Sequence, residues 1–340
     1  MDFAYQIAKS EEKRIMMVQD FNLVADVGGT NTRLALSEGK SLKHETIRRY
    51  KNSFTSSFEE IVEQYLSDIP VSQIHSTCIA VAGPVHQGWA ELTNIDWKIQ
   101  NDQLKKLLNT RISFIINDMQ AQGYALASLQ AKEVQHVYGA KNIDLSKRML
   151  VCGIGTGFNI ALVLPTNTRF IVPPSEAGHA RLTAGNSIEQ KIVDYLINTR
   201  GFAEIEEVLS GRGMALINSV LFPKNSRNSE EIIAQATKDP EAKQVIDIFT
   251  TIMGSYLGDL TLTTLPEGGI FLIGGVSRAI SKFLKEDTFG FGFCDKGRFS
   301  DFNKNFGIHL IIDDYAALKG CANYLCHGSG ISQDPNVLRQ

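Results

Sequence analysis

The sequence Asp26-Val-Gly-Gly-Thr-Asn-Thr-Arg33 lies between two short apolar runs, Leu23–Ala25 before it and Leu34–Leu36 after it. A strand, a Gly-Gly turn and a second strand form a β-hairpin. Glycines let backbone N–H groups approach a bound anion closely, and an acid beside such a turn can hold Mg²⁺ through water. Read alone, the segment is more simply an ordinary hairpin turn, so its function depends on the rest of the chain.

Composition and charge exclude several classes of protein. The chain has 340 residues, 43% of them hydrophobic and 21% charged, which indicates a globular protein of about two domains. The net charge of −3 provides no basic face for nucleic acid, and we find no apolar run near the ~18 residues of a membrane helix. We therefore expect no nucleic-acid partner and no membrane partner.

The N-terminal segment and the cysteines favour a cytoplasmic location. Residues 1–20 lack the continuous apolar stretch of a secretory signal, and we expect residues 1–19 to form a leader or an extra helix. The five cysteines include no C-x-x-C pair and no zinc spacing, which predicts reduced thiols in a cytoplasmic protein.

Short apolar runs alternate with segments of helical period along the chain. This alternation predicts an α/β architecture. The expected strands cover 22–25, 78–82, 112–116, 149–152, 269–273 and 308–312. The expected helices cover 58–66, 101–108, 118–129, 187–199, 230–238, 241–262 and 276–284.

The pattern of the opening hairpin recurs later in the chain. The stretch Val24–Leu36 resembles Val151–Leu162, since both read as a strand, a Gly/Thr turn and a strand. Two such hairpins suggest two related α/β halves with a ligand between their turns. Gly153 stands where the first copy has Asp26, so only the first turn supplies an acid for a metal ion.

Asp118 is the candidate catalytic carboxylate. It ends the run Ile115-Ile116-Asn117-Asp118, and a carboxylate at the carboxyl end of a strand is well placed to take a hydroxyl proton. Locally, the simpler interpretation is that Asp118 caps the helix that follows it. The two roles are compatible.

Two acidic segments and one glycine segment are further candidates. Ser175-Glu-Ala-Gly-His179 brings a carboxylate and an imidazole together in a turn, which suits sugar hydroxyls but also an exposed loop. The acids Glu204, Glu206 and Glu207 fit a solvated helix face. In Ile270–Ser277 a Gly-Gly pair between strand and helix admits either a ligand or close packing.

In this order, the motifs resemble the bacterial glucokinases of the non-ROK type, within the hexokinase–actin–Hsp70 ATPase superfamily. The resemblance covers about residues 20 to 327 and includes Ile79–Pro84 as a connecting segment and Leu92–Trp97 near the sugar. It implies two ribonuclease-H-like α/β domains with an inter-domain active-site cleft. The expected small domain is 20–128 plus 317–330, and the expected large domain is 129–316.

The resemblance also implies ATP-dependent phosphorylation of glucose at the 6-hydroxyl, with Mg²⁺. Asp118 becomes the catalytic base, and Asp26 becomes the magnesium residue, acting through water. The implied sugar-binding residues are Asn94, Asn117, Asp118, Glu176, His179 and Glu206. The implied residues for ATP are Asp26, Gly28, Gly29, Thr30, Asn31, Gly155, Thr156, Gly157, Gly274 and Gly275. Family members often dimerise, so a homodimer is expected.

The sequence departs from the family pattern at two turns. Ser175 and Ala177 stand where the family often has glycine, and Met119 follows Asp118 where it often has Phe. These changes bear on sugar preference, and a kinase for another hexose is one alternative. A non-catalytic sugar sensor, or a nucleotide-binding assembly protein on the same fold, is the other.

Overall fold

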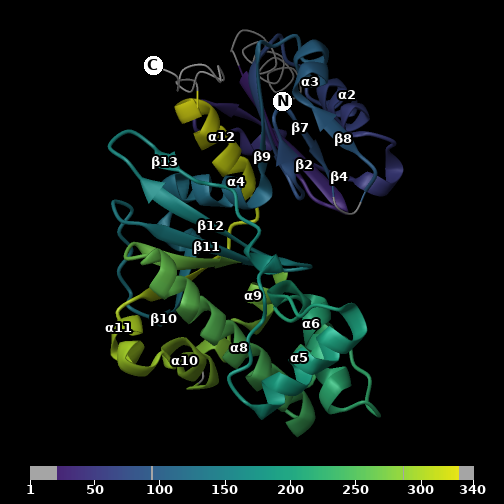
Figure 1. The fold of residues 1–340 in the computed structure, drawn as a ribbon. Helices are drawn as coiled ribbons and strands as arrows, with labels where there is room; N and C mark the ends of the chain where they lie inside the picture. The colour runs from purple at the N-terminus through teal and green to yellow at the C-terminus, as the bar shows by residue number, and fades with distance from the viewer. Residues whose placement is uncertain (1–20, 93–94, 286, 329–340) are drawn as a thin grey trace, which may run out of the picture. The chain divides into compact units, whose positions relative to one another are not determined.

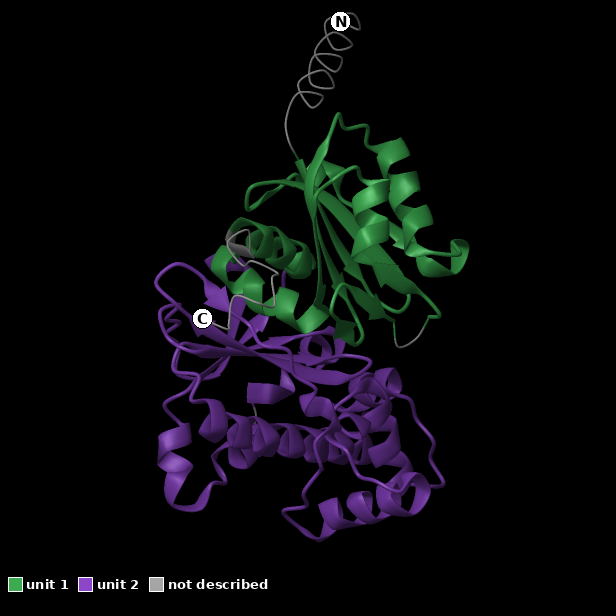
Figure 2. Ribbon diagram, turned by 45° about the horizontal axis from the view of Figure 1, so that its top comes forward, with its two compact units in different colours: residues 1–129, 314–340 green, residues 130–313 purple. Residues whose placement is uncertain are grey.

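The computed structural model describes residues 21–92, 95–285 and 287–328, so the predicted leader lies outside the described residues. The chain divides into two compact units, coloured separately in Figure 2. Unit 1 comprises residues 1–129 and 314–340, and unit 2 comprises residues 130–313. Each unit contains a six-stranded mixed sheet with helices, which confirms the predicted α/β class (Figure 1).

The sheet of unit 1 begins with the predicted hairpin. Its strand order is β3-β2-β1-β5-β9, with β4 beside β2. β1, β5 and β9 are parallel, whereas β1 and β2 are antiparallel with Asp26 opposite Arg33. The strands are β1 Phe21–Val27, β2 Asn31–Glu38, β3 Ser41–Leu42, β4 Arg48–Lys51, β5 Ile74–Val81 and β9 Ile112–Asn117. A separate small sheet contains β6 Val85–His86, β7 Trp89–Glu91 and β8 Lys98–Gln100.

Alternate residues of β1 enter two different cores. Phe21, Leu23 and Ala25 pack in the cluster that contains side chains of α2 (Phe58–Asp68) and α3 (Asn101–Leu107). Val24 belongs instead to the cluster that contains α4 (Asp118–Ala125) and α12 (Ala316–Gly328). Both faces of the sheet are therefore covered, which explains why its central strands read as continuous apolar runs.

Unit 2 repeats the hairpin at the centre of its own sheet. The strand order is β10-β15-β14-β11-β12-β13, in which β11, β14 and β15 are parallel. The strands are β10 Val134–Gly139, β11 Met149–Ile154, β12 Phe158–Pro165, β13 Phe170–Ile171, β14 Gly269–Ile273 and β15 Gly307–Ile311. In both units the first hairpin strand has an antiparallel partner on one side and a parallel partner on the other.

The helices of unit 2 contribute many of the buried side chains in its core, together with its strands. They are α5 Ser187–Arg200, α6 Gly211–Leu221, α7 Ser229–Gln235, α8 Pro240–Thr264, α9 Gly275–Ile280, α10 Asp287–Cys294 and α11 Ser300–Asn303.

Single-turn 3₁₀ helices occur in both units. They are η1 His44–Thr46, η2 Asn52–Phe54, η3 Leu126–Ser128, η4 Ala131–Glu133, η5 Ala177–His179, η6 Ile205–Glu207, η7 Phe283–Lys285 and η8 Gly297–Phe299.

The longest helix, α8, is a core helix. Asp239 caps it by accepting hydrogen bonds from two backbone N–H groups, and Pro240 fills its first turn. By length and composition α8 is apolar enough to span a membrane, contrary to the expectation from sequence. Its side chains Phe249 and Leu257 are completely buried in unit 2, however, so the apolar surface is used for packing.

Candidate functional site

The first glycine turn joins β1 to β2 over residues 28–30. The N–H of Gly28 donates to the carbonyl of Asn31 at 3.0 Å, which closes the turn. Thr30 is exposed at its tip. The predicted phosphate-binding residues Gly28, Gly29, Thr30 and Asn31 therefore share one short, partly exposed loop.

Asp26 lies beside this turn and pairs with Arg33 across the hairpin. The guanidinium donates to one carboxylate oxygen at 3.0 Å. Burial raises the pKa of Asp26, and the charge and hydrogen bond of Arg33 oppose that rise. Because a carboxylate has two acceptor oxygens, pairing with Arg33 leaves it able to accept a water as well.

The residues present fit a magnesium ion held mainly by the nucleotide. Among residues 21–92, 95–285 and 287–328, no group of three or more His, Cys, Asp or Glu side chains is arranged to hold a metal ion. Mg²⁺ usually keeps several waters and takes one or two carboxylates together with substrate phosphates. A single acid beside a predicted phosphate-binding turn matches that requirement, so Asp26 remains the predicted magnesium residue.

Asn52, which no sequence motif marks, holds the first turn through hydrogen bonds. Its amide nitrogen Nδ2 donates to the carbonyl of Gly28 at 2.8 Å, and its Oδ1 accepts from the Thr32 hydroxyl at 2.8 Å. Its backbone N–H also donates to the carbonyl of Thr30 at 3.0 Å. Nothing in the local sequence indicates these contacts, because β4 and η2 reach the hairpin only through sheet pairing.

Asp118 follows β9 directly, as predicted, but the helix cap is its neighbour. Asn117 is the N-cap of α4: its Oδ1 accepts from the N–H of Met119 at 2.9 Å, and Gln120 accepts from the Asn117 N–H. The expectation that Asp118 caps this helix is therefore wrong by one residue. Asp118 is the first helical residue, and its Oδ1 also accepts from Met119 N–H, at 2.8 Å.

Asp26 and Asp118 lie at the carboxyl ends of parallel strands in one mixed sheet. Asp26 lies near the end of β1, Asp118 directly follows β9, and β5 lies between these two strands. Since neighbouring strands are about 4.8 Å apart, the two strands are separated by roughly 10 Å. At the same edge, Asn117 Nδ2 donates to the carbonyl of Gly83 at 3.3 Å, which ties the ends of β5 and β9 together. The predicted sugar residue Asn94 lies outside the described residues.

In unit 2 the second glycine turn contacts the predicted adenosine segment. Gly155 N–H donates to the carbonyl of Gly157 at 2.9 Å, and Thr156 is exposed between them. Gly274 has a φ of +104°, and a Cβ there would lie 2.2 Å from the carbonyl oxygen of Ile154. A Cβ on Gly155 would in turn lie 4.0 Å from the backbone nitrogen of Gly275. The fold thus brings the two glycine segments together at the ends of β11 and β14.

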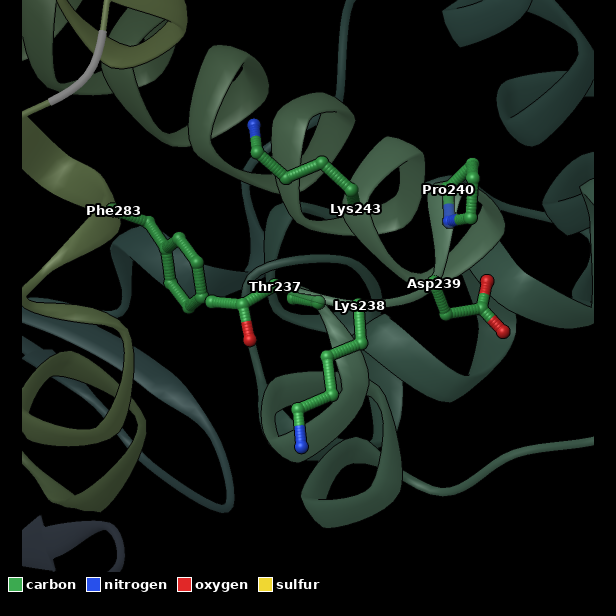
Figure 3. Close-up of a pocket in the computed structure, with 7 residues that line it drawn as sticks. Thr237, Lys238, Asp239, Pro240, Lys243 and Phe283 are labelled. Atoms are coloured by element: carbon green, nitrogen blue, oxygen red, sulfur yellow. The ribbon is translucent and has the colours of Figure 1, made fainter.

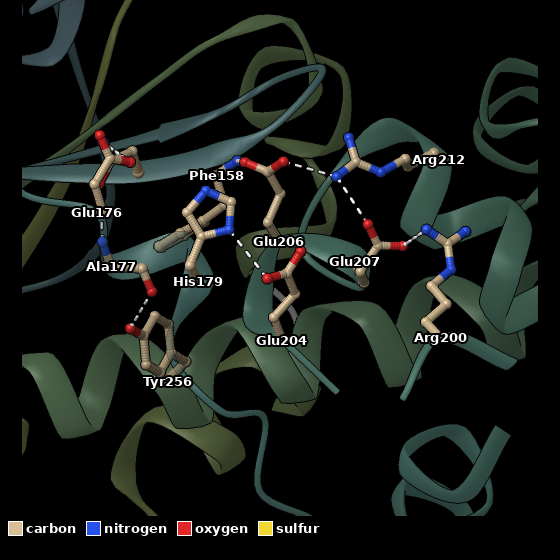
Figure 4. A network of polar contacts seen from close by, with 11 residues as sticks. Phe158, Glu176, Ala177, His179, Arg200, Glu204, Glu206, Glu207, Arg212 and Tyr256 are labelled. Carbon is tan, nitrogen blue, oxygen red and sulfur yellow. Dashed lines mark hydrogen bonds and ion pairs between the residues drawn. The ribbon is translucent and has the colours of Figure 1, made fainter. Parts of the chain in front are cut away.

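The turn with Glu176 and His179 is held in place by its backbone. Asn159, another residue not foreseen, donates to the carbonyl of Ser175 at 2.6 Å and accepts from Ala177 N–H at 3.1 Å. The Tyr256 hydroxyl donates to the Ala177 carbonyl at 2.9 Å. Glu176 and His179 are both exposed, which leaves their side chains accessible to a ligand (Figure 4).

His179 connects this turn to the acidic segment. Its Nδ1 lies 3.0 Å from Glu204 Oε2. The hydrogen bond to Glu204 raises the pKa of His179 against the opposing effect of burial, and the charges of Glu204, Glu206 and Glu176 add to the rise. The imidazole is therefore more readily protonated than a free histidine.

Glu206 and Glu207 do not form a solvated helix face, which corrects that interpretation. They lie in the single turn η6, and the side chain of Glu207 is only 8% exposed. Glu206 accepts from the Phe158 N–H at 2.9 Å and from Arg212 at 2.7 Å (Figure 4). Arg212 is the third residue that sequence reasoning missed. Its contacts join segments far apart in the chain.

A cavity of about 400 Å³ lies elsewhere in unit 2, where α7 leads into α8 (Figure 3). Lys238, Lys243 and Phe283 are among its lining residues. None of the predicted site residues lines it.

The comparisons with known proteins agree with these motifs. The model of the glucokinase family matches residues 23–327. The chain is 32% identical over 312 residues to a glucokinase of Salmonella arizonae, covering 90% of this chain and 97% of that protein.

The chain belongs to the glucokinase family. The predicted family, and with it the predicted enzyme class, is confirmed. Solved structures that share the fold include two glucokinases. A glucokinase from an Antarctic psychrotroph is similar with a TM-score of 0.79 and 28% identity, covering 92% of this chain and all of that one. A glucokinase from Balamuthia mandrillaris in complex with glucose has a TM-score of 0.77 at 19% identity, covering 93% and 98%, and supports the fold alone.

Proposed function

We propose that this protein transfers the terminal phosphoryl group of ATP to the 6-hydroxyl of glucose. The observation that carries the proposal is the family match along residues 23–327. Within that span, Asp118 follows the parallel strand β9 at the sheet edge that also carries Asp26. Phosphoryl transfer depends on positioning and charge stabilisation, and both glycine turns suit that task.

Asp118 is the proposed base. It accepts the proton of the 6-hydroxyl as the oxygen attacks phosphorus, which typically contributes about 10²- to 10⁴-fold to the rate. The Asn117 cap fixes the start of α4, and so fixes the backbone that carries Asp118. Asn117 itself is proposed to contact the sugar through its amide.

The sugar is proposed to bind the side chains of Glu176, His179 and Glu206. Carboxylates accept hydrogen bonds from hydroxyl groups, and a histidine donates or accepts according to its protonation. The hydrogen bonds of Asn159 and Tyr256 hold the backbone of this turn through contacts within the protein. A site built in this way rejects sugars that leave its polar groups unpaired.

The ATP phosphates are proposed to lie against the two glycine turns. Residues 28–31 and 155–157 have little side-chain bulk near their backbone N–H groups, of which those of Gly28 and Gly155 donate within their own turns. A Cβ on Gly275 would meet nothing within 4 Å, which leaves room for adenosine, whereas Gly274 lies against the Ile154 backbone. Asp26 would hold Mg²⁺ through water. When bound, that ion neutralises charge developing on the phosphates.

A coupled assay of ADP formation tests the proposal. Wild type should consume ATP with glucose and Mg²⁺, and other hexoses should be poorer substrates. Asp118→Asn should lower kcat by at least about 100-fold while glucose binding, measured by titration, changes little. Asp102→Asn, at another helix start but 87% exposed, is the matched control and should retain activity.

Three results would contradict the proposal. Substantial turnover by Asp118→Asn would exclude its role as base. A better hexose than glucose would reassign the substrate, and glucose binding without turnover in wild type would indicate a sensor. The cytoplasmic location and the homodimer remain predictions, which fractionation and light scattering of the purified protein would check.

A further inference from the structure

Arg212 contacts two parts of the candidate site that lie far apart in the sequence, the second glycine turn and the acidic segment. It is the second residue of α6, which Ser210 caps by accepting from the Gly213 N–H at 3.2 Å. Its Nη1 donates to the carbonyl of Thr156, in the second glycine turn, at 2.8 Å. Its Nη2 donates to Glu206 at 2.7 Å and to Glu207 at 3.1 Å (Figure 4).

Glu206 is held at both carboxylate oxygens by this arrangement. Oε1 accepts from Arg212, and Oε2 accepts from the N–H of Phe158, the residue directly after the turn. A Cβ on Gly157 would lie 2.4 Å from Oε2, so the carboxylate is seated against the turn itself. Thr156, Arg212, Glu206 and Phe158 thus form a closed set of contacts, and moving one partner strains the others.

The start of α6 is also tied to the turn through its backbone. Gly211 N–H donates to the carbonyl of Gly155 at 2.9 Å. Arg212 is therefore anchored on its backbone side, while its side chain remains 45% exposed. A planar guanidinium with several donors is suited to hold a carbonyl and a carboxylate at once, whereas an ammonium lacks this fixed fork.

A second arginine provides a natural contrast. Arg200 pairs with Glu207 at 2.5 Å and is 50% exposed, close to the exposure of Arg212. The structure gives Arg200 no hydrogen bond or ion pair with Glu206 or with residues 155–157. Both arginines therefore form an ion pair with Glu207, but of the two it is Arg212 that donates a hydrogen bond to the glycine turn.

We propose that Arg212 is a positioning residue that couples sugar binding to nucleotide binding. The inference rests on the proposed function, in which Glu206 contacts the sugar and residues 155–157 contact the phosphates. A sugar that fixes Glu206 also fixes Arg212, and through it the Thr156 carbonyl. The turn is then ordered before ATP arrives, so each ligand reduces the ordering that the other requires, and the coupling is reciprocal.

The test measures glucose affinity by isothermal titration, with and without saturating β,γ-imido analogue of ATP and Mg²⁺. In wild type the analogue should tighten glucose binding at least about fivefold. Arg212→Met should reduce this factor to below about twofold while glucose still binds. Arg212→Lys, which keeps the charge but lacks the fork, should give an intermediate factor. Arg200→Met should keep the wild-type factor.

Several outcomes would overturn the inference. These are no coupling in wild type, an unchanged factor in Arg212→Met or Arg212→Lys, an equal loss in Arg200→Met, and loss of glucose binding itself in Arg212→Met. If Arg212→Met does not fold, Arg212→Lys decides. Turnover of glucose by wild type, measured in parallel, tests the proposed function separately, since turnover with no coupling refutes only the role of Arg212.

Discussion

Replacing Asn52 with alanine should loosen the first glycine turn. Asn52 is only 4% exposed, and its side chain makes two hydrogen bonds, to the Gly28 carbonyl and from the Thr32 hydroxyl, each at 2.8 Å. The substitution removes both bonds and leaves the Thr32 hydroxyl, which has no exposed surface, without this acceptor.

The cost follows from ordinary hydrogen-bond energetics. The lost bond to the Gly28 carbonyl contributes about 1 kcal/mol, and the Thr32 hydroxyl left without its acceptor costs about 1–3 kcal/mol. The expected loss in the free energy of unfolding is therefore roughly 2–4 kcal/mol. Because the turn is the proposed phosphate site, the KM for ATP should rise while the affinity for glucose remains near that of wild type.

Urea unfolding and ATP kinetics at saturating glucose measure the two effects. Asn305→Ala is the matched control, since exposed Asn305 makes a single side-chain hydrogen bond, to the Phe302 carbonyl at 3.1 Å, and should lose less than about 1 kcal/mol. Asn52→Asp keeps the acceptor for Thr32 but places an oxygen against the Gly28 carbonyl, so it should also raise the ATP KM. Equal stabilities for Asn52→Ala and Asn305→Ala would refute the reasoning.

Three further substitutions have distinct expected results. Gly274→Ala forces an alanine to a φ of +104° and places its Cβ 2.2 Å from the Ile154 carbonyl oxygen, so the free energy of unfolding should fall by at least about 1 kcal/mol. Gly275→Ala is the control, because a Cβ there meets nothing within 4 Å, and equal thermal stability of the two variants would contradict this prediction. Burial lowers the pKa of His309 to about 4, so the folded protein loses stability as the pH falls below the ordinary value of about 6.5. Between pH 7 and pH 5 the free energy of unfolding should fall by about 2 kcal/mol in wild type but not in His309→Phe. The same pH dependence of urea unfolding in both proteins would contradict this prediction. Glu176→Gln should weaken glucose binding roughly 10- to 100-fold in titrations with little change in stability, and an unchanged affinity would remove Glu176 from the sugar site.

Much of the sheet framework was predictable from the sequence. The glycine hairpins and the apolar runs predicted β1, β5, β9, β11, β14 and β15, because buried parallel strands need continuous apolar sequence. The difference between Asp26 and Gly153 was also readable, since the first strands of the two hairpins align residue by residue up to their turns. These features depend on local pattern alone.

The helices rich in glycine were not predictable. α6 begins Gly211-Arg212-Gly213, and α10 contains Gly290 and Gly292, which intrinsic propensity disfavours in helices. Packing explains Gly292, because a Cβ there would lie 2.2 Å from the Thr251 carbonyl of α8. Gly290 instead lies against the Tyr138 side chain of β10, and Gly213 against the Val208 carbonyl, so the requirement for glycine comes from contacts outside each helix and has no signature in a single segment.

The supporting polar contacts were hidden for a related reason. Asn52, Asn159 and Arg212 each act through partners from other elements, and nothing nearby in the sequence marks them. The cap before α4 differs in kind. Asn117 and Asp118 are both good capping residues, and only the backbone geometry decides which of them does so.

The position of α12 has a consequence for synthesis of the chain. Residues 130–313 of unit 2 are continuous in sequence, whereas unit 1 needs α12 from the far end of the chain. Leu318, Cys321 and Ala322 of that helix cover one face of the unit 1 sheet, against Val24 and Cys78. During translation, unit 2 can therefore be complete while that face of unit 1 still lacks its cover. The chain order thus allows the unit whose synthesis begins first to be the unit whose core is completed last.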